Sequence, residues 1–369
     1  MFLRNFVSLF ELANFQFDKK LIVPREDGNF YLWMWYSCND AQNVVGYFAH
    51  KNKRPPLPTK STSLPLHYTH HDVADLVWVI GSCPMFTSEA SKGQYHIPDE
   101  EWFSNQLEVN VNWIRQLDAD PQPLLEFLRE HPHKLLGKRF ETLVEFWLKN
   151  SPDYDFRFAN VQLKTGPATS GEIDFLCREK ATGEFVHFEV ACKYYLATTS
   201  ALVWDKWMGA NGNDSLHHKM KKFEKQFLVL EREEGKKFLE RNSLDKPARV
   251  LIMKGYFFHH CSMIGKHRSP KYAHPHHQGG WFMFHFELDS LRDSVPQWIV
   301  PPKEFWMSPY CSPSGTLEVF TGSELVQQVD DVMIKKGKAP LIIQVENRDG
   351  WDVETSRGFI VKDDWPFSE

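Results

Sequence analysis

The chain has 369 residues, of which 42% are hydrophobic, 14% aromatic and 25% charged. These fractions are ordinary for a globular protein and argue against extended disorder. The formal net charge of −5 excludes polyanion binding by bulk charge. Any contact with nucleic acid must therefore come from a local basic patch.

The cysteines and the apolar runs indicate the compartment. The cysteines form no CxxC pair, a pattern typical of reduced thiols in an intracellular protein. No apolar run approaches the ~20 residues of a membrane span. In the N-terminal segment MFLRNFVSLFELANF, Glu11 and the lack of a small-residue cleavage site argue against a signal peptide; an organelle presequence is the weaker alternative. We expect an intracellular, cytoplasmic protein that binds no membrane, with its oligomeric state left open.

The first part of the chain divides into an N-terminal extension, residues 1–65, and a helical segment, residues 66–130. In the extension, NFYLWMWYS and NVVGYFAH read as strands, and KNKRPPLPTKSTSLPL has the composition of a linker. In the helical segment, HHDVADLVWVIGSCP predicts one helix. Residues 102–132 then predict a helix, a turn at 118–123 and a short second helix.

Residues 131–262 predict the order helix, three strands, helix, strand. KLLGKRFETLVEFWLKN places its apolar side chains on one face at helical spacing. FRFANVQL, GEIDFLCRE and HFEVACKYYLA predict the three strands. After a loop, SLHHKMKKFEKQFLVLERE predicts a helix capped by Asp214 or Ser215, and RVLIMKGYFF a buried strand.

Residues 263–369 predict a C-terminal αβ extension that follows a loop rich in His and Gly. SELVQQVDDVMIKK predicts a helix, and PLIIQVE and SRGFIVK predict strands. The loop side chains are zinc ligands by type, but their spacing matches no closed zinc motif. An exposed polar loop is favoured over a zinc site for this set: His259, His260, Cys261, His267, His274, His276 and His277.

The hairpin formed by the second and third core strands brings two acids together. If residues 180–183 form the turn, Glu179 faces Glu184, and all further opposed pairs have positions that sum to 363. Asp174 then faces Glu189, with Cβ atoms ~5 Å apart on one face of the sheet. Alternation adds further residues to that face: Glu172, His187, Ala191 and Lys193.

Two carboxylates at this distance repel each other unless a cation lies between them. Mg²⁺ binds one or two carboxylates and keeps its remaining waters, so Asp174 and Glu189 predict a Mg²⁺ (or Mn²⁺) site. Lys193 would reach a phosphate oxygen, and Glu141 of the preceding helix would add a carboxylate, although Glu145 competes for that place. The alternatives are a solvated sheet face and a β-bulge that separates the two acids.

The element order, with an acid on the second strand and an acid and a lysine on the third, resembles the PD-(D/E)XK nuclease-like superfamily. More closely, LLGKRFETLVEFWL, GEIDFLCRE, HFEVACKYYLA, WMGANGNDSLHHK, KGYFFHH, GGWF and ETSRGF resemble a bacterial family associated with that superfamily, domain-of-unknown-function family 1853. The resemblance begins near residue 70 and continues almost to the C-terminus. It implies an α/β (α+β) fold with a restriction-endonuclease-like core between the helical part and the C-terminal extension.

By this resemblance Glu141 matches the helix acid, Asp174 the second-strand acid, Glu189 the third-strand acid and Lys193 the lysine. The superfamily pattern has one residue between the last acid and the lysine, whereas EVACK has three. Ala191 therefore occupies the usual lysine position.

The resemblance implies a Mg²⁺-dependent nuclease that hydrolyses phosphodiesters of DNA or RNA. Glu172, opposite Ala191 in the expected register, is a candidate for compensating the shifted lysine. The alternative function is a catalytically inactive nucleic-acid-binding or scaffold protein that keeps the fold. A zinc-stabilised interaction module is more distant.

Two further features predict contacts with phosphate. The helix after Ser215 carries a basic face away from its apolar residues, which suits binding to a nucleic-acid backbone; a solvated Lys-rich face is the alternative. This basic face consists of His218, Lys221, Lys222 and Lys225. Arg357 is a candidate phosphate clamp near the acids, with a structural ion pair to Glu354 as an equal alternative.

Overall fold

A computed structural model describes residues 68–165, 168–199, 202–263 and 268–366, together with three N-terminal strands. These strands, β1 (Lys19–Pro24), β2 (Phe30–Cys38) and β3 (Ala41–Val45), form an antiparallel sheet in the order β1-β2-β3. They belong to a compact unit separate from the one that contains most of the chain. β2 confirms the first predicted strand. β3 contains the first three residues of the second, whose residues 46–50 lie outside the described residues, and β1 was not predicted. The predicted linker at 51–66 lies outside the described residues.

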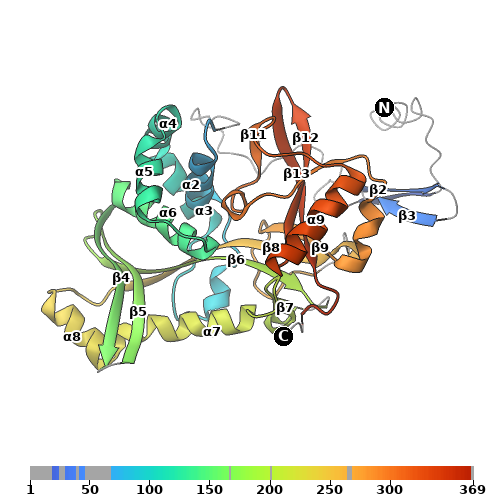
Figure 1. Ribbon diagram of the computed structural model, residues 1–369. Helices are drawn as coiled ribbons and strands as arrows, with labels where there is room; N and C mark the ends of the chain where they lie inside the picture. Colours follow the sequence, from blue (N-terminus) through green and yellow to red (C-terminus); the bar gives the residue numbers. More distant parts are fainter. Residues whose placement is uncertain are drawn as a thin grey trace. The chain divides into compact units, whose positions relative to one another are not determined.

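One large mixed sheet organises the main unit (Figure 1). At one end β4, β5 and β6 pair antiparallel, β6 continues into the parallel series β8, β9 and β13, and β13, β12 and β10 pair antiparallel at the other end. Within the described residues the strand order is β10 (Gln297–Ile299), β12 (Leu341–Arg348), β13 (Trp351–Val361), β9 (Gln278–Phe284), β8 (Ala248–His260), β6 (Phe185–Ala197), β5 (Ala168–Glu179) and β4 (Tyr154–Thr165). Two short strands, β7 (Trp207–Met208) and β11 (Cys311–Pro313), pair with β6 and β13.

Helices cover both faces of the central strands. Phe188, Val190 and Cys192 of β6 share a core with one group of helices: α2 (His71–Gly81), α3 (Glu100–Val109), α4 (Val111–Ala119), α5 (Gln122–Glu130) and α6 (Leu136–Asn150). Ala191 and Tyr195 point to the other face and pack against α7 (Leu216–Phe227). Alternation along β6 therefore assigns its residues to two helical layers.

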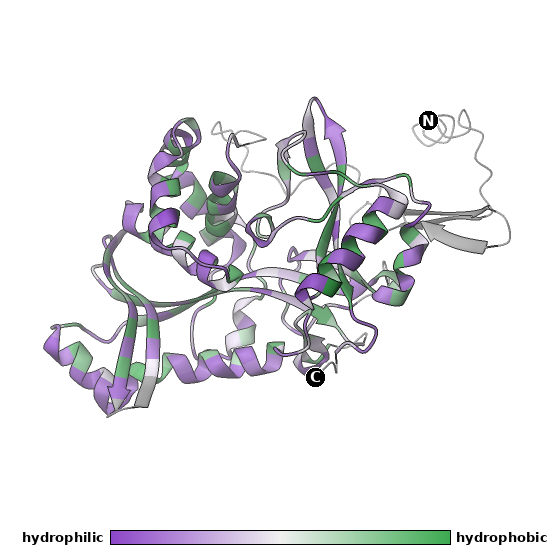
Figure 2. Cartoon of the chain, viewed as in Figure 1, coloured by the Kyte–Doolittle hydropathy of each residue, from purple (hydrophilic) through white to green (hydrophobic). Residues whose placement is uncertain are grey.

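The remaining helices pack at the two ends of the sheet. α8 (Glu233–Arg241) contacts β4, and α9 (Gly322–Lys336) packs on β12 and β13. In Figure 2, α7 is coloured hydrophilic along most of its visible side, as expected for an amphipathic helix that buries one stripe. The described residues thus form a mixed α/β fold, and none of their helices is both long and apolar enough to cross a membrane.

Most predicted elements are present, whereas β7, β9, β10 and β11 were not predicted, and β9 begins within the segment expected to be a loop. The single helix predicted after residue 102 is broken at Asn110 (φ −93°, ψ 2°), whose side-chain amide donates to the Gln106 carbonyl at 2.8 Å. Such a local bond competes with helix continuation. α8 was not predicted. Its Gly235 allows close packing, since a Cβ there would lie 2.3 Å from the Val229 carbonyl oxygen.

Candidate functional site

The β5–β6 hairpin has the predicted register over its first half. Phe175 pairs with Phe188 and Arg178 with Phe185, and the Glu179 N–H donates to the Glu184 carbonyl at 2.8 Å. The ladder ends at the Phe175–Phe188 pair. Beyond it β5 continues to pair with β4 and β6 with β8. We call this end of the β5–β6 ladder the fork. The two predicted acids, Asp174 and Glu189, are the first residues beyond it.

A side chain replaces the missing ladder bond at the fork. Continued pairing would place the Val190 N–H opposite Ile173, but Val190 instead donates to Asp174 Oδ2 at 3.0 Å. β4 is irregular at the same level, where Asn160 has a φ of 53°. With strict alternation, Ile173 and Leu176 of β5, three residues apart, would point to opposite faces of the sheet. Both nevertheless belong to the same core cluster. The strict alternation expected for β5 is therefore broken around Asp174.

This distortion corrects the placement expected for Glu172. Because β5 has left β6 by this point, Glu172 pairs with Gln162 of β4, and the β5–β6 ladder does not reach Ala191. Its charge still acts on the site, since it contributes to raising the pKa of Glu189. Glu172 thus lies near the predicted acids without the expected pairing.

Asp174 and Glu189 are buried carboxyl groups with strongly perturbed acidity. Asp174 is 8% exposed and Glu189 is fully buried. Burial, and then the charge of Glu189, raises the pKa of Asp174 to about 7. Burial raises the pKa of Glu189 to about 8, although Lys219 and Asp174 oppose the shift. Without a cation, the folded protein holds protons here that ordinary carboxyl groups release.

His187 orients one oxygen of Glu189 and leaves the other without a partner. Burial lowers the pKa of His187 to about 4, so its imidazole is neutral near pH 7. His187 Nε2 lies 2.8 Å from Glu189 Oε1, within hydrogen-bond distance of this carboxyl group. Within the described structure, Glu189 Oε2 is buried and accepts no hydrogen bond. That oxygen is available to a ligand.

Two lysines lie near the acids, Lys193 on β6 and Lys219 on α7. Lys193 Nζ lies 2.6 Å from Asp214 Oδ2, on the segment that leads into α7. Lys219 of α7 was missed by the sequence analysis. Burial, and then the charges of Lys193 and Lys222, lowers the pKa of Lys219 to about 8, while Asp174 and Glu189 act in the opposite direction. Lys219 therefore shares an electrostatic environment with both acids.

The position of Lys219 follows from helical spacing. It lies three residues after Leu216 and four before Phe223, both of which are buried, and its Nζ is 4.0 Å from the Phe223 ring centroid. A lysine at the border of an apolar stripe can keep its stem on the core and direct its ammonium group sideways. This spacing was the signal in the sequence that could have identified it.

Glu141 lies on α6, in the layer opposite α7. Lys138 Nζ is 2.5 Å from Glu141 Oε2, and the charge of Glu141 contributes to the raised pKa of Asp174. The competing residue Glu145 forms its own ion pair with Lys149 at 2.6 Å. Glu141 is therefore within electrostatic range of the fork.

The basic face of α7 is exposed, while the apolar residues of the helix are buried. Ser215 caps the helix by accepting from the His218 N–H at 3.3 Å. Lys221, Lys222 and Lys225 are exposed, and none of them has an ion-pair partner among the residues that the structure describes. These side chains can meet a polyanion without first breaking an internal pair.

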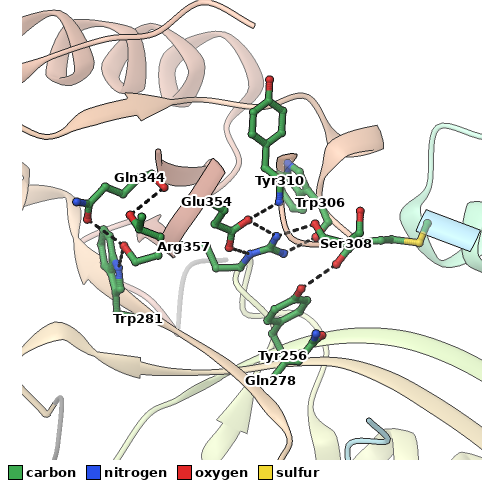
Figure 3. A network of polar contacts seen from close by, with 12 residues as sticks. Tyr256, Gln278, Trp281, Trp306, Ser308, Tyr310, Gln344, Glu354 and Arg357 are labelled. Atoms are coloured by element: carbon green, nitrogen blue, oxygen red, sulfur yellow. Dashed lines mark hydrogen bonds and ion pairs between the residues drawn. The ribbon is translucent and has the colours of Figure 1, made fainter. Parts of the chain in front are cut away.

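Arg357 occupies a structural network away from the fork (Figure 3). Its guanidinium donates to both oxygens of Glu354, at 2.6 and 2.7 Å, and to the carbonyls of Trp306 and Ser308. It also lies 4.3 Å from the Tyr256 ring centroid and is only 2% exposed. β9 and β8 separate its strand from β6. The structure therefore places Arg357 in the ion pair with Glu354 that was the alternative to a phosphate clamp.

The predicted polar loop is shorter than the sequence suggested. His259 and His260 belong to β8, Cys261 follows in a 3-10 turn, and β9 begins at Gln278. His259 is buried rather than exposed. His267 lies outside the described residues, and the remaining histidines lie in the segment before β9.

Comparison with known proteins gives one match. A family model described as a domain of unknown function (DUF1853) matches residues 74–361, a span that contains the fork, α7 and Arg357. No curated protein and no solved structure matches the chain.

Proposed function

The chain belongs to the DUF1853 family, and we propose that it is a nuclease with a PD-(D/E)XK-type core that uses Mg²⁺ or Mn²⁺. The observation that carries this proposal is the buried pair Asp174 and Glu189 at the β5–β6 fork. Burying two carboxyl groups side by side costs folding energy, because either both ionise against each other or they retain protons near neutral pH. A divalent cation removes this conflict.

The donor set fits a hard cation. Both residues offer carboxylate oxygens, which Mg²⁺ and Mn²⁺ prefer. The unpartnered Glu189 Oε2 supplies one ligand atom, and His187 holds the other oxygen of that carboxylate in place. Asp174 would supply the second, and Glu141 is the candidate for a third carboxylate. When bound, such an ion activates water and offsets the charge that develops on a phosphate.

Lys219 takes the role that the superfamily pattern gives to a lysine at the position of Ala191. Its charge acts on both acids, and it reaches the site from α7 rather than from β6. An ammonium group there would stabilise the developing negative charge on the scissile phosphate. Lys193, held by Asp214, would position the substrate backbone from the same side.

Two arrangements support a nucleic-acid substrate. The exposed basic face of α7 lies on the same helix as Lys219, so a phosphate backbone along it would pass the fork. In addition, α6, the three strands β4 to β6, α7 and β8 follow the superfamily order, with β6 and β8 parallel. The short strand β7 and α8 are insertions in that order.

A specific observation favours the inactive alternative. Ala191 stands at the usual lysine position, and Lys193 is already paired with Asp214. If Lys219 cannot approach the phosphate, the protein would bind nucleic acid through α7 and the acids would have no catalytic role. This second function predicts binding that neither depends on metal nor changes in Asp174→Asn.

The test begins with Mn²⁺ titration by calorimetry, with and without a short oligonucleotide. Wild type, Asp174→Asn and Glu189→Gln are compared with Glu145→Gln, a matched acid on α6 that pairs with Lys149. We expect saturable binding in wild type and in the control and loss of binding in both site variants. Equal binding in all four proteins would contradict the metal site.

Cleavage is measured next on single- and double-stranded DNA and RNA with Mg²⁺. Metal-dependent cleavage that disappears in Asp174→Asn would support the nuclease. Metal-independent binding of equal strength in wild type and Asp174→Asn, without cleavage in either, would support the inactive alternative.

A further inference from the structure

A second group of potential metal ligands lies outside the acidic fork. Cys83 follows α2, Glu100 opens α3, and His274 lies in the segment before β9. One ligand atom from each residue lies within 4.8 Å of the other two. These residues are far apart in the sequence, which is why ligand spacing gave no zinc motif.

The backbone holds Cys83 and His274 against each other. Phe86 and Ala273 form an antiparallel bridge, and the His274 N–H donates to the Met85 carbonyl at 2.9 Å. Prolines follow both ligands, at Pro84 and Pro275, and restrict the preceding backbone to extended conformations. The two side chains therefore meet through rigid local structure rather than through a chance contact of flexible loops.

The tautomer of His274 suits metal binding. The backbone N–H of His276 donates to His274 Nδ1 at 3.2 Å, which identifies Nδ1 as the nitrogen that carries the lone pair. Cys83 Sγ lies 2.8 Å from the same atom, within hydrogen-bond distance. In a tetrahedral zinc site the corresponding S···N separation is about 3.5 Å. A zinc ion between the two atoms would replace the thiol proton and take the Nδ1 lone pair from the His276 N–H, and the S···N separation would grow by less than about 1 Å.

Glu100 has a supporting partner of its own. His276 Nδ1 lies 2.8 Å from Glu100 Oε2, the kind of second contact that orients a ligating carboxylate. Thiolate, imidazole and carboxylate together are donors for zinc, whereas Mg²⁺ and Ca²⁺ avoid thiolate. All three side chains are partly exposed, so a fourth position remains accessible to water.

A second mixed cluster, His260, Cys261 and Glu287, is less suited. Glu287 Oε2 already accepts from the Phe284 backbone N–H at 2.8 Å and lies 2.8 Å from His260 Nε2. The other His260 nitrogen is bonded to Ser262 at 2.7 Å. This cluster therefore provides a matched control.

We propose that Cys83, Glu100 and His274 form a zinc site, with one position open to water and with His276 orienting Glu100. The site would join the start of the helical layer to the segment that leads into β9. It is independent of the acidic fork, and Asp174→Asn should leave it intact.

The test uses the full chain, stripped of metal by a chelator and titrated with Zn²⁺ and with Co²⁺. We expect one thiolate-bound ion per chain, seen as a thiolate-to-cobalt absorption band, besides any ion that the acidic fork binds. Cys83→Ser should abolish the band, and Glu100→Gln and His274→Ala should weaken binding at least about tenfold. Cys261→Ser should behave as wild type. A thiolate-to-cobalt band that persists in Cys83→Ser, or its loss in Cys261→Ser, would overturn the proposal.

Misfolding of a variant is separated from ligand loss in two ways. The melting temperature of metal-free Cys83→Ser is compared with that of metal-free wild type. In wild type itself, zinc should slow alkylation of the Cys83 thiol, measured by peptide mass spectrometry. Alkylation of Cys83 at the same rate with and without zinc would refute the site.

Discussion

Asp174 accepts a hydrogen bond from the Val190 N–H at the point where β5 stops pairing with β6. The Asp174 side chain thus replaces a backbone carbonyl as the acceptor. The two strands can therefore diverge without leaving the buried Val190 N–H unsatisfied. The same carboxyl group lies beside Glu189. The chain therefore uses one residue to end the ladder and to build the acidic pair.

The stability of the metal-free protein should fall as pH rises from about 4 to about 8. Burial raises the pKa of Asp174 to about 7 and of Glu189 to about 8, so the folded state keeps protons that the unfolded chain releases near pH 4. Stability is then lost with increasing pH, by up to about 1.4 kcal/mol per pH unit for each group. Urea unfolding at pH 5 and pH 8 with a chelator present measures this loss.

Asp174→Asn should flatten that dependence and be more stable than wild type at pH 8 without metal. Asn keeps an acceptor for the Val190 N–H and carries no charge. Added Mn²⁺ should stabilise wild type at pH 8 and leave the variant unchanged. The same loss of stability between pH 5 and pH 8 in both proteins would rule out Asp174 as its source.

Lys219→Met should lower nuclease activity far more than Lys221→Met. Lys219 is partly buried beside the acids, whereas Lys221 is exposed on the basic face of the same helix. Methionine preserves the packing of the Lys219 stem on Phe223. We expect a loss of roughly 10²-fold or more in kcat, the scale of removing one transition-state donor. Single-turnover cleavage measures it; equal rates in both variants would show that Lys219 is not catalytic.

Gly255→Ala should disrupt β6 beside Lys193. Gly255 has a φ of 138°, and a Cβ there would lie 1.8 Å from the Lys193 carbonyl oxygen. Because backbone cannot move aside cheaply, we expect a loss of more than about 3 kcal/mol or failure to fold. Gly315→Ala is the control: its φ is 87°, but no atom lies within 4 Å, so it should cost about 1–2 kcal/mol. Thermal unfolding distinguishes the two.

Arg357→Met should destabilise the fold without changing Mn²⁺ binding. The variant leaves the Glu354 carboxylate buried among the carbonyls that Arg357 satisfied, at a cost of roughly 3–5 kcal/mol. The double variant Arg357→Met, Glu354→Gln should lose less stability than the sum of the losses in the two single variants. Urea unfolding and Mn²⁺ titration separate stability from site integrity. Loss of Mn²⁺ binding in a folded Arg357→Met protein would show that Arg357 contributes to the metal site at the fork.

The sequence by itself determined most helices and strands of the core and the register of the hairpin over its first half. The apolar spacing around Phe140 and Leu143 predicted α6, and the turn at 180–183 fixed which residues of β5 and β6 face each other. Both are local signals, since helical periodicity and turn length act over a few residues. Matching segments along the chain also indicated the family that the comparison shows.

Only the tertiary structure decided where the hairpin opens and what reaches it. The fork at Asp174 lies where β4 is irregular at Asn160 and where β5 stays paired with β4 while its ladder with β6 ends. The packing of α7 brings Lys219 near the acids at the fork, and the strand order of the sheet places Arg357 away from them. No local sequence pattern encodes either arrangement. Cys83 and His274 meet for the same reason. Contacts between residues distant in the sequence depend on how the whole chain packs, and the spacing of residues along the sequence does not reveal that packing.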